Sequence, residues 1–241
     1  MKIGIYGLGR FGTFWARELA KHFDVVGFSK HLENKPDLKG LNIVSLEDLM
    51  KSEVVFLCNS ISSMDEVVKE IADLSGDKTV IADTCSVKIY PLEIMKKYLA
   101  DGKFVMTHPM FGPDSGANGV QGLPVVVDSL GNEELFDKFN KIFSKMKLKI
   151  IKMTCDEHDR QAAYSQGLTH FIGRVLGNIN LEKIEIGTHG YNLLLEVIKN
   201  TCNDSLELFK DLQQYNPYTK IMRSDVYKSL DEIKCLLDGI C

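Results

Sequence analysis

A histidine set among prolines and glycines is the residue of this chain best suited to chemistry. His108 stands directly before Pro109 in the segment Thr107–Pro113, and a glycine-rich run continues to Gly119. Pro109 biases His108 toward an extended backbone, so we expect a rigid loop here, not a helix or a central strand. A histidine held at a fixed angle can transfer a proton near neutral pH. An incidental histidine in a surface loop is the alternative.

A glycine pattern, Gly-x-Gly-x-x-Gly, occupies residues 7–12. It follows an apolar run at 2–6 and opens a helical pattern, the context in which this spacing indicates a dinucleotide-binding turn. The first glycine permits the bend, the second lets the backbone approach a pyrophosphate, and the third allows close helix–strand packing. A glycine turn without a ligand is the alternative. The predicted cofactor-binding residues in this turn are Gly7, Leu8, Gly9, Arg10, Phe11 and Gly12.

The end of the second predicted strand, at 25–28, bears on which nucleotide binds. NAD-binding sites of this kind carry an acidic residue here for the ribose hydroxyls. This chain has Ser29, Lys30 and His31 instead, which offer a hydroxyl and positive charge. That composition suits a 2′-phosphate, so we predict NADP as the cofactor. NAD, with Lys30 as a solvated loop residue, is the alternative.

Polar residues also follow three later apolar runs, at 54–58, 79–83 and 104–107. The carboxyl ends of parallel strands meet at one edge of a sheet, where ligands bind, so His108 should share an edge with the nucleotide. Ser86 lies after the second of these runs, where a serine also commonly caps a helix. Further nucleotide contacts are predicted at Cys58, Asn59, Ser60, Asp83 and Thr84.

The chain changes character near residue 153. Residues 1–153 alternate β-rich and helical patterns, which predicts an α/β fold with a Rossmann-like, doubly wound, mostly parallel sheet as the NADP-binding domain. Residues 154–241 predict a smaller all-helical domain for substrate binding and dimerisation, with helices at 158–177, 191–214 and 223–237. A helical part of this size is small for an independent core, so we expect a homodimer.

Composition excludes several other classes of protein. The net charge is -4 and the basic residues are scattered, which argues against a nucleic-acid partner. No apolar run approaches the roughly 20 residues that span a bilayer, and the amino terminus has no signal-peptide pattern, so we predict a cytoplasmic protein without a membrane partner. The six cysteines lack the short Cys-x-x-Cys spacing of metal sites, so we predict no metal and free thiols.

Four segments together resemble the prephenate/arogenate dehydrogenases of tyrosine biosynthesis, and the resemblance covers nearly the whole chain. They are Asp-Thr-Cys-Ser-Val-Lys at 83–88, Thr-His-Pro-Met-Phe-Gly-Pro-Asp-Ser-Gly at 107–116, the segment 158–170, and Asn-Thr-Cys-Asn-Asp-Ser-Leu-Glu-Leu-Phe at 200–209. The second and fourth are most similar to the arogenate-using, plant-like branch. The resemblance implies oxidative decarboxylation of arogenate to tyrosine, in which a ring hydride passes to NADP+ and the ring carboxylate leaves as CO2. Conversion of prephenate to 4-hydroxyphenylpyruvate is the alternative.

The resemblance also implies roles for individual residues. His108 would accept the C4-hydroxyl proton, and Ser86 would hydrogen-bond the same hydroxyl or His108. Asp204 would attract the ammonium group of arogenate and repel the keto acid of prephenate, although a capping or surface aspartate is the alternative. His158 is expected to be a structural residue at a helix start. The implied substrate-binding residues are Gln166, Thr169, His170 and Asp204.

Three points remain open at this level. The arginine that would bind the ring carboxylate cannot be assigned among Arg160, Arg174 and Arg223. A dehydrogenase of 3-hydroxy acids would rely on a lysine in the helical part, such as Lys199, but would leave the His108 segment unexplained. An NADP(H)-sensing regulator would bind the nucleotide without turnover and would have no use for His108.

Overall fold

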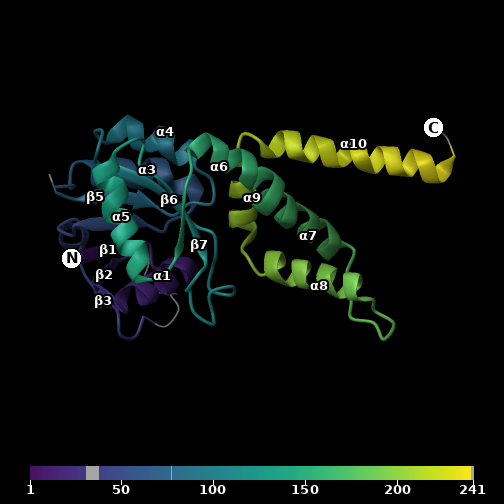
Figure 1. Ribbon diagram of the computed structural model, residues 1–241, viewed down its shortest axis with the longest axis horizontal. Coiled ribbons are helices and arrows are strands. Elements are labelled where there is room, and N and C mark those ends of the chain that lie inside the picture. Colours follow the sequence, from purple (N-terminus) through teal and green to yellow (C-terminus); the bar gives the residue numbers. More distant parts are fainter. Residues whose placement is uncertain (31–37, 77, 240–241) are drawn as a thin grey trace. The chain divides into compact units, whose positions relative to one another are not determined.

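The computed structural model describes residues 1–30, 38–76 and 78–239. The chain divides into two compact units, Met1–His158 and Asp159–Cys241. The first contains an eight-stranded sheet with helices, and the second consists of helices (Figure 1). The predicted fold class, a Rossmann-like, mostly parallel sheet followed by a smaller helical part, is therefore confirmed. The functional domain boundary at 153/154 stays a prediction.

The sheet places the first strand near its centre, in the order β3-β2-β1-β4-β5-β6-β7-β8. All neighbouring strands run parallel except β6 and β7, which run antiparallel. Chain order reverses between β1 and β4, and such a reversal creates a ligand-binding crevice at the carboxyl ends of the strands. The strands are β1 (Lys2–Tyr6), β2 (Asp24–Phe28), β3 (Asn42–Ile43), β4 (Val54–Leu57), β5 (Val80–Asp83), β6 (Phe104–Pro109), β7 (Pro124–Asp128) and β8 (Lys149–Lys152).

An aromatic cluster fixes two helices on one face of the sheet. The Phe56 ring of β4 lies 5.7 Å from the Trp15 ring and 5.9 Å from the Phe139 ring, between centroids. Because strand side chains alternate between faces, Val55 and Leu57 are buried on the opposite face. Burying each large apolar side chain stabilises the fold by about 1.5–3 kcal/mol. The helices of this unit are α1 (Arg10–Ala20), α2 (Leu46–Leu49), a 3-10 turn (Ile61–Ser63), α3 (Met64–Ala72), α4 (Ile89–Tyr98), α5 (Glu133–Lys145) and the start of α6 (Cys155–Ala162).

Strand β6 contains His108 and Pro109, so the prediction that this segment could not be a central strand was wrong. Met110 N donates to Pro124 O toward β7, and amides alternate in direction along a strand. The nitrogen of Pro109 therefore points toward β5, whose backbone pairing with β6 ends at Val105. A proline is tolerated there because no ladder hydrogen bond is lost.

The helical unit contains a break that the hydrophobic pattern did not show. The predicted helix 191–214 is interrupted at 203–205, because Asn, Asp and Ser favour caps and turns over helix interiors. Ser205 caps the next helix by accepting a hydrogen bond from Leu208 N at 3.1 Å. The elements that follow α6 are a π-helical turn (Ala163–Gly167), α7 (Leu168–Asn178), α8 (His189–Cys202), α9 (Leu206–Tyr215) and α10 (Thr219–Asp238).

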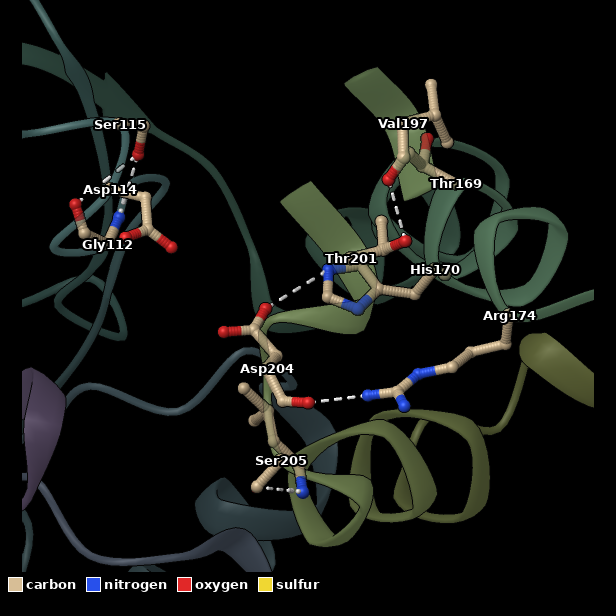
Figure 2. Close-up of polar contacts among 12 residues, drawn as sticks. Gly112, Asp114, Ser115, Thr169, His170, Arg174, Val197, Thr201, Asp204 and Ser205 are labelled. Carbon is tan, nitrogen blue, oxygen red and sulfur yellow. Dashed lines mark hydrogen bonds and ion pairs between the residues drawn. The ribbon is translucent and has the colours of Figure 1, made fainter. Parts of the chain in front are cut away.

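Helices α7 and α8 approach each other closely at Gly173. A Cβ atom at this position would lie 2.0 Å from Thr201 Oγ1, so only glycine fits. Thr201 in turn donates to Val197 O at 2.8 Å within α8 (Figure 2). The close crossing fixes the α7 and α8 residues of this unit relative to one another.

The thiols differ in part from the prediction. Cys58, Cys85, Cys155 and Cys202 are free, whereas Cys235 is disulfide-bonded, so the prediction of free thiols throughout was wrong for Cys235. Within 1–30, 38–76 and 78–239, no group of three or more His, Cys, Asp or Glu residues is arranged to hold a metal ion. No helix in those same ranges combines the length and apolar character needed to cross a membrane.

Candidate active site

The glycine turn leaves room for a ligand at one position only. Gly7 has φ +93°, and a Cβ there would lie 2.9 Å from Cys58 O. A Cβ at Gly12 would lie 1.8 Å from Gly7 O, so both positions are fixed by packing. A Cβ at Gly9 would meet nothing within 4 Å. Open space above Gly9 is what the approach of a pyrophosphate requires.

The start of α1 suits an anion for a second reason. Gly9, its N-cap, provides no side-chain hydrogen bond, and the first turn contains no acidic residue. The amide groups at this helix end and the positive end of the helix dipole are therefore available to a phosphate. The turn fits the dinucleotide that its sequence predicts.

Three side chains of the glycine turn contact other residues of the protein. Leu8 is fully buried in the core, and the Phe11 ring packs 6.0 Å from the Trp15 ring. Arg10 Nη2 forms an ion pair with Asp114 Oδ2 at 2.5 Å, which ties the turn to the segment after His108. Leu8 and Phe11 are thus placed to contribute their backbone, not their side chains, to a nucleotide site.

The residues after β2 lie beside carboxylates. Ser29 is buried, and Lys30 Nζ lies 2.8 Å from Glu66 Oε1 and 3.1 Å from Glu70 Oε2 of α3. The third residue predicted here, His31, lies outside the described residues. Lys30 is therefore an exposed lysine that forms two ion pairs.

The residues after β4 form a local hydrogen-bonded turn. Asn59 Nδ2 donates to Ser60 O at 2.8 Å and to Ser63 Oγ at 2.9 Å, while its Oδ1 is buried without a hydrogen-bond partner among the described residues. Thr84 Oγ1, after β5, donates to Leu57 O at 2.8 Å. Burial raises the pKa of the Cys58 thiol to about 12, so it stays protonated and unreactive.

Asp83 belongs to a buried hydrogen-bonded network that contacts β6, the strand that contains His108. Its carboxylate pairs with Lys88 and accepts from Thr107 N at 3.0 Å, and Lys88 Nζ donates to Thr107 O at 2.7 Å. Burial raises the pKa of Asp83, and the Lys88 ammonium opposes that effect. Because both carboxylate oxygens have internal partners, Asp83 is placed to position β6, not to touch a nucleotide through its side chain.

His108 is buried and bonded to a second histidine of the same unit. Only 4% of its surface is exposed, and its Nδ1 lies 2.8 Å from Nε2 of His158. Burial, followed by electrostatic interaction with His158 and with Lys88, holds the pKa of His108 well below its usual value. The imidazole is therefore neutral at physiological pH. When Nδ1 donates to His158, Nε2 is unprotonated, which is the form that a general base needs.

The Ser86 hydroxyl has no internal task. It is buried and has no hydrogen-bond partner within the described part of the chain. It does not cap α4, whose N-cap is Lys88, and it makes no hydrogen bond to His108. Buried hydroxyls are normally paired, so Ser86 is suited to a ligand.

The helical unit has its own polar cluster, which joins α7 to the break before α9. His170 Nε2 lies 3.9 Å from Asp204 Oδ2, and Arg174 Nη2 donates to the main-chain oxygen of Asp204 at 2.5 Å (Figure 2). His170 Nδ1, Gln166 Oε1 and Arg174 Nε are buried without hydrogen-bond partners among the residues described. Burial lowers the pKa of His170, and Asp204 opposes that shift. Since Ser205 caps α9, Asp204 is not the capping residue.

Other predicted residues of this unit are differently placed. Thr169 Oγ1 donates to Ser165 O of its own helix at 2.8 Å and is exposed. Arg223 Nη1 donates to Gln213 Oε1 at 2.6 Å, and the Arg160 guanidinium lies 5.6 Å from the Tyr218 ring centroid, whereas Arg174 bonds Asp204 directly. Lys199 is exposed, which disfavours the 3-hydroxy acid alternative.

The sequence alone did not identify His158, Lys88 or Arg174 as site residues. His158 lies 50 positions from its partner His108, and no local pattern connects residues so far apart. One weak feature of the sequence points to Lys88. It is a lysine at the end of a βα loop, within a stretch that is otherwise apolar. Arg174 was considered but could not be distinguished from Arg160 and Arg223.

The fold and these residues define a class: a Rossmann-type nucleotide-binding unit joined to a helical unit. A family model described as "Prephenate dehydrogenase, nucleotide-binding domain" matches residues 30–152, about half the chain, and one described as "TYRAAT1-like, C-terminal domain" matches 175–240. The chain belongs to the prephenate/arogenate dehydrogenase family.

Named relatives are similar over most of the chain. Arogenate dehydrogenase 2, chloroplastic, of Arabidopsis thaliana is 36% identical over 230 residues, which are 90% of this chain and 64% of that protein. Arogenate dehydrogenase 1, chloroplastic, of the same plant is 33% identical over 252 residues, 99% of this chain and 39% of that protein. The chain thus spans less than two thirds of either relative. The cytoplasmic location stays a prediction.

Solved structures share the fold. Prephenate dehydrogenase from A. aeolicus, in complex with hydroxyphenyl propionate and NAD+, has a TM-score of 0.78 at 16% identity, covering 99% of this chain and 91% of that one. Synechocystis arogenate dehydrogenase has a TM-score of 0.73 at 19% identity, covering 99% of this chain and 92% of that one. At these identities the likeness concerns the fold alone.

Proposed function

We propose that this chain catalyses the NADP-dependent oxidative decarboxylation of arogenate to tyrosine. The observation that carries the proposal is the buried, neutral His108, held by His158 in a strand that ends at the same sheet edge as the glycine turn. A base in this state accepts a proton from a neutral hydroxyl. Plant relatives named arogenate dehydrogenases support the choice of reaction.

Residues of the first unit have separate roles in the proposed reaction. The bound nicotinamide supplies a hydride acceptor. His108 Nε2 accepts the proton of the C4 hydroxyl as the C4 hydride leaves, and His158 holds the Nδ1 proton so that Nε2 keeps its lone pair. Ser86 Oγ hydrogen-bonds the same hydroxyl. The bond to the ring carboxylate then breaks with its electrons passing into the ring, CO2 leaves, and the phenolate oxygen takes the proton back from His108 Nε2 to give the phenol.

The helical unit supplies substrate discrimination. Asp204 offers a carboxylate to the ammonium group of arogenate, and Arg174 holds its main chain (Figure 2). A keto acid lacks that ammonium group, so the same carboxylate disfavours prephenate. Gln166 Oε1 and His170 Nδ1, both buried and without hydrogen-bond partners among the described residues, are suited to the polar side chain of the substrate.

The test is direct. Purified protein mixed with arogenate and NADP+ is expected to form NADPH, tyrosine and CO2 in equal amounts. The same assay with prephenate, and with NAD+ in place of NADP+, measures both preferences. Turnover of prephenate that exceeds turnover of arogenate by a large factor would reject the proposed substrate.

We also propose that the chain forms a homodimer through its helical unit. Exposed apolar residues recur along one stripe of α10 at spacings of three and four, namely Tyr227, Leu230, Ile233 and Leu237, which are 53%, 57%, 53% and 79% exposed. A stripe of this kind normally packs against another helix. Light scattering is expected to give a molar mass near twice 27.1 kDa, and Leu230→Glu is expected to lower it. A monomer at all concentrations would contradict this.

A further inference from the structure

The lysine after β2 is held by two acidic residues of α3. Glu66 and Glu70 are four residues apart, so they share one face of the helix. Lys30 Nζ bonds both, at 2.8 Å and 3.1 Å. Glu70 Oε2 also accepts a hydrogen bond from Tyr6 Oη at 2.7 Å, from the carboxyl end of β1. Two strand ends and one helix thus meet in a single ionic cluster, Tyr6–Lys30–Glu66–Glu70.

The charge of this cluster bears on the nucleotide. One ammonium faces two carboxylates, and the Lys30 ammonium lowers the pKa of Glu66, which therefore stays ionised at neutral pH. The bond to Glu66 likewise raises the pKa of Lys30 and keeps it charged. In folds of this type the residues after β2 lie beside the 2′ position of the adenosine ribose. A 2′-phosphate must therefore compete with two carboxylates for Lys30.

We propose that Glu66 and Glu70 are specificity-determining residues for the nucleotide, because they engage Lys30 and limit how strongly the chain prefers NADP over NAD. The proposal rests on the proposed use of a nicotinamide dinucleotide. Lys30, and the lack of an acidic residue at positions 29–31 of the sequence, favour the 2′-phosphate. Glu66 and Glu70 reduce that advantage, and Tyr6 keeps Glu70 in place.

The experiment uses nucleotide fragments and no substrate. Titration calorimetry measures binding of 2′,5′-ADP, which carries the 2′-phosphate, and of 5′-AMP, which differs from it only in lacking that phosphate. Glu66→Gln is expected to raise the affinity for 2′,5′-ADP up to about fivefold, and Glu66→Gln with Glu70→Gln roughly tenfold, since each exposed ion pair contributes modestly. Affinity for 5′-AMP is expected to change less than about twofold, because it lacks the group that Lys30 would bind.

A matched control is available on the same helix. Asp65→Asn removes one charge from α3, but Asp65 bonds Lys97 at 2.9 Å and does not contact Lys30. This variant is expected to leave the ratio of the two affinities unchanged. An unchanged ratio in the double Gln variant would overturn the specificity role while leaving the cofactor proposal intact. Failure of the unaltered protein to bind either fragment would overturn both.

Discussion

Replacement of His108 by Asn is expected to lower kcat with arogenate by about 10²- to 10⁴-fold, the usual contribution of a general base. Asn is smaller than His but keeps an amide group that can still bond His158, so β6 should keep its pairing with β7. NADPH binding, followed by fluorescence, is expected to change less than about twofold, because the proposed phosphate site is made by the glycine turn. Full activity in the His108→Asn variant would remove His108 from the mechanism.

The pH profile separates a base from a residue that only fills space. Burial lowers the pKa of His108, so the imidazole is neutral, and active, at all pH values above that lowered pKa. The acid limb of kcat/KM is therefore expected well below 6.5, with activity lost as pH falls through it. His158→Ala removes one of the causes of the lowering, so the acid limb should move upward in pH.

The same His158 variant should also slow the reaction by about 10- to 100-fold, because Nδ1 of His108 loses the acceptor that fixes its tautomer. Circular dichroism and thermal unfolding show whether the fold persists. An acid limb that stays in place in folded His158→Ala protein would contradict the assigned role of His158.

Replacement of Asp204 by Asn is expected to shift the ratio of kcat/KM for arogenate over prephenate toward prephenate by roughly 10- to 100-fold. The variant removes the charge that attracts an ammonium group and repels a keto acid. Asp204 is only partly buried, so solvent screening keeps the effect below that of a fully buried pair. The fold should persist, because Ser205 provides the cap and Arg174 bonds the main-chain oxygen that Asn retains.

Glu207→Gln is the matched control for Asp204. It removes the same charge three residues away, from an exposed position in the first turn of α9. Steady-state kinetics with both substrates are expected to show the wild-type ratio in this variant. If Asp204→Asn and Glu207→Gln behave alike, general electrostatics and not a specific contact would explain the preference.

Local patterns predicted much of the first unit. The glycine spacing beside an apolar run located the turn at Gly7–Gly12, because both the bend and the helix start depend on adjacent residues. The strand at 104–107 was predicted, but its continuation through His108 and Pro109 was missed because the tolerance of Pro109 depends on where the pairing with β5 ends. Lys30 was correctly marked as a cation near the end of β2, but its carboxylate partners lie 36 and 40 residues away. Long-range partners of this kind are set by the sheet and not by spacing.

The helical unit shows the same limit. Apolar periodicity continues across 203–205, so it gave no sign that the helix stops there and brings Asp204 beside His170. The capping preferences of Asn, Asp and Ser were present in the sequence. These capping preferences predict the helix break at 203–205 when they are given more weight than the hydrophobic pattern.

The π-helical turn at Ala163–Gly167 has a consequence for how this segment tolerates changes in length. Such a turn is equivalent to one residue inserted into an α-helix. The wider turn takes up the extra residue, so deleting one residue there would restore regular winding and leave everything from Leu168 onward facing nearly as it does now. A deletion in the regular part of α7 before His170 would instead rotate His170 and Arg174 by about 100° relative to the preceding helix. Tolerance to a change in length is thus a property of this turn and not of the helix that follows it.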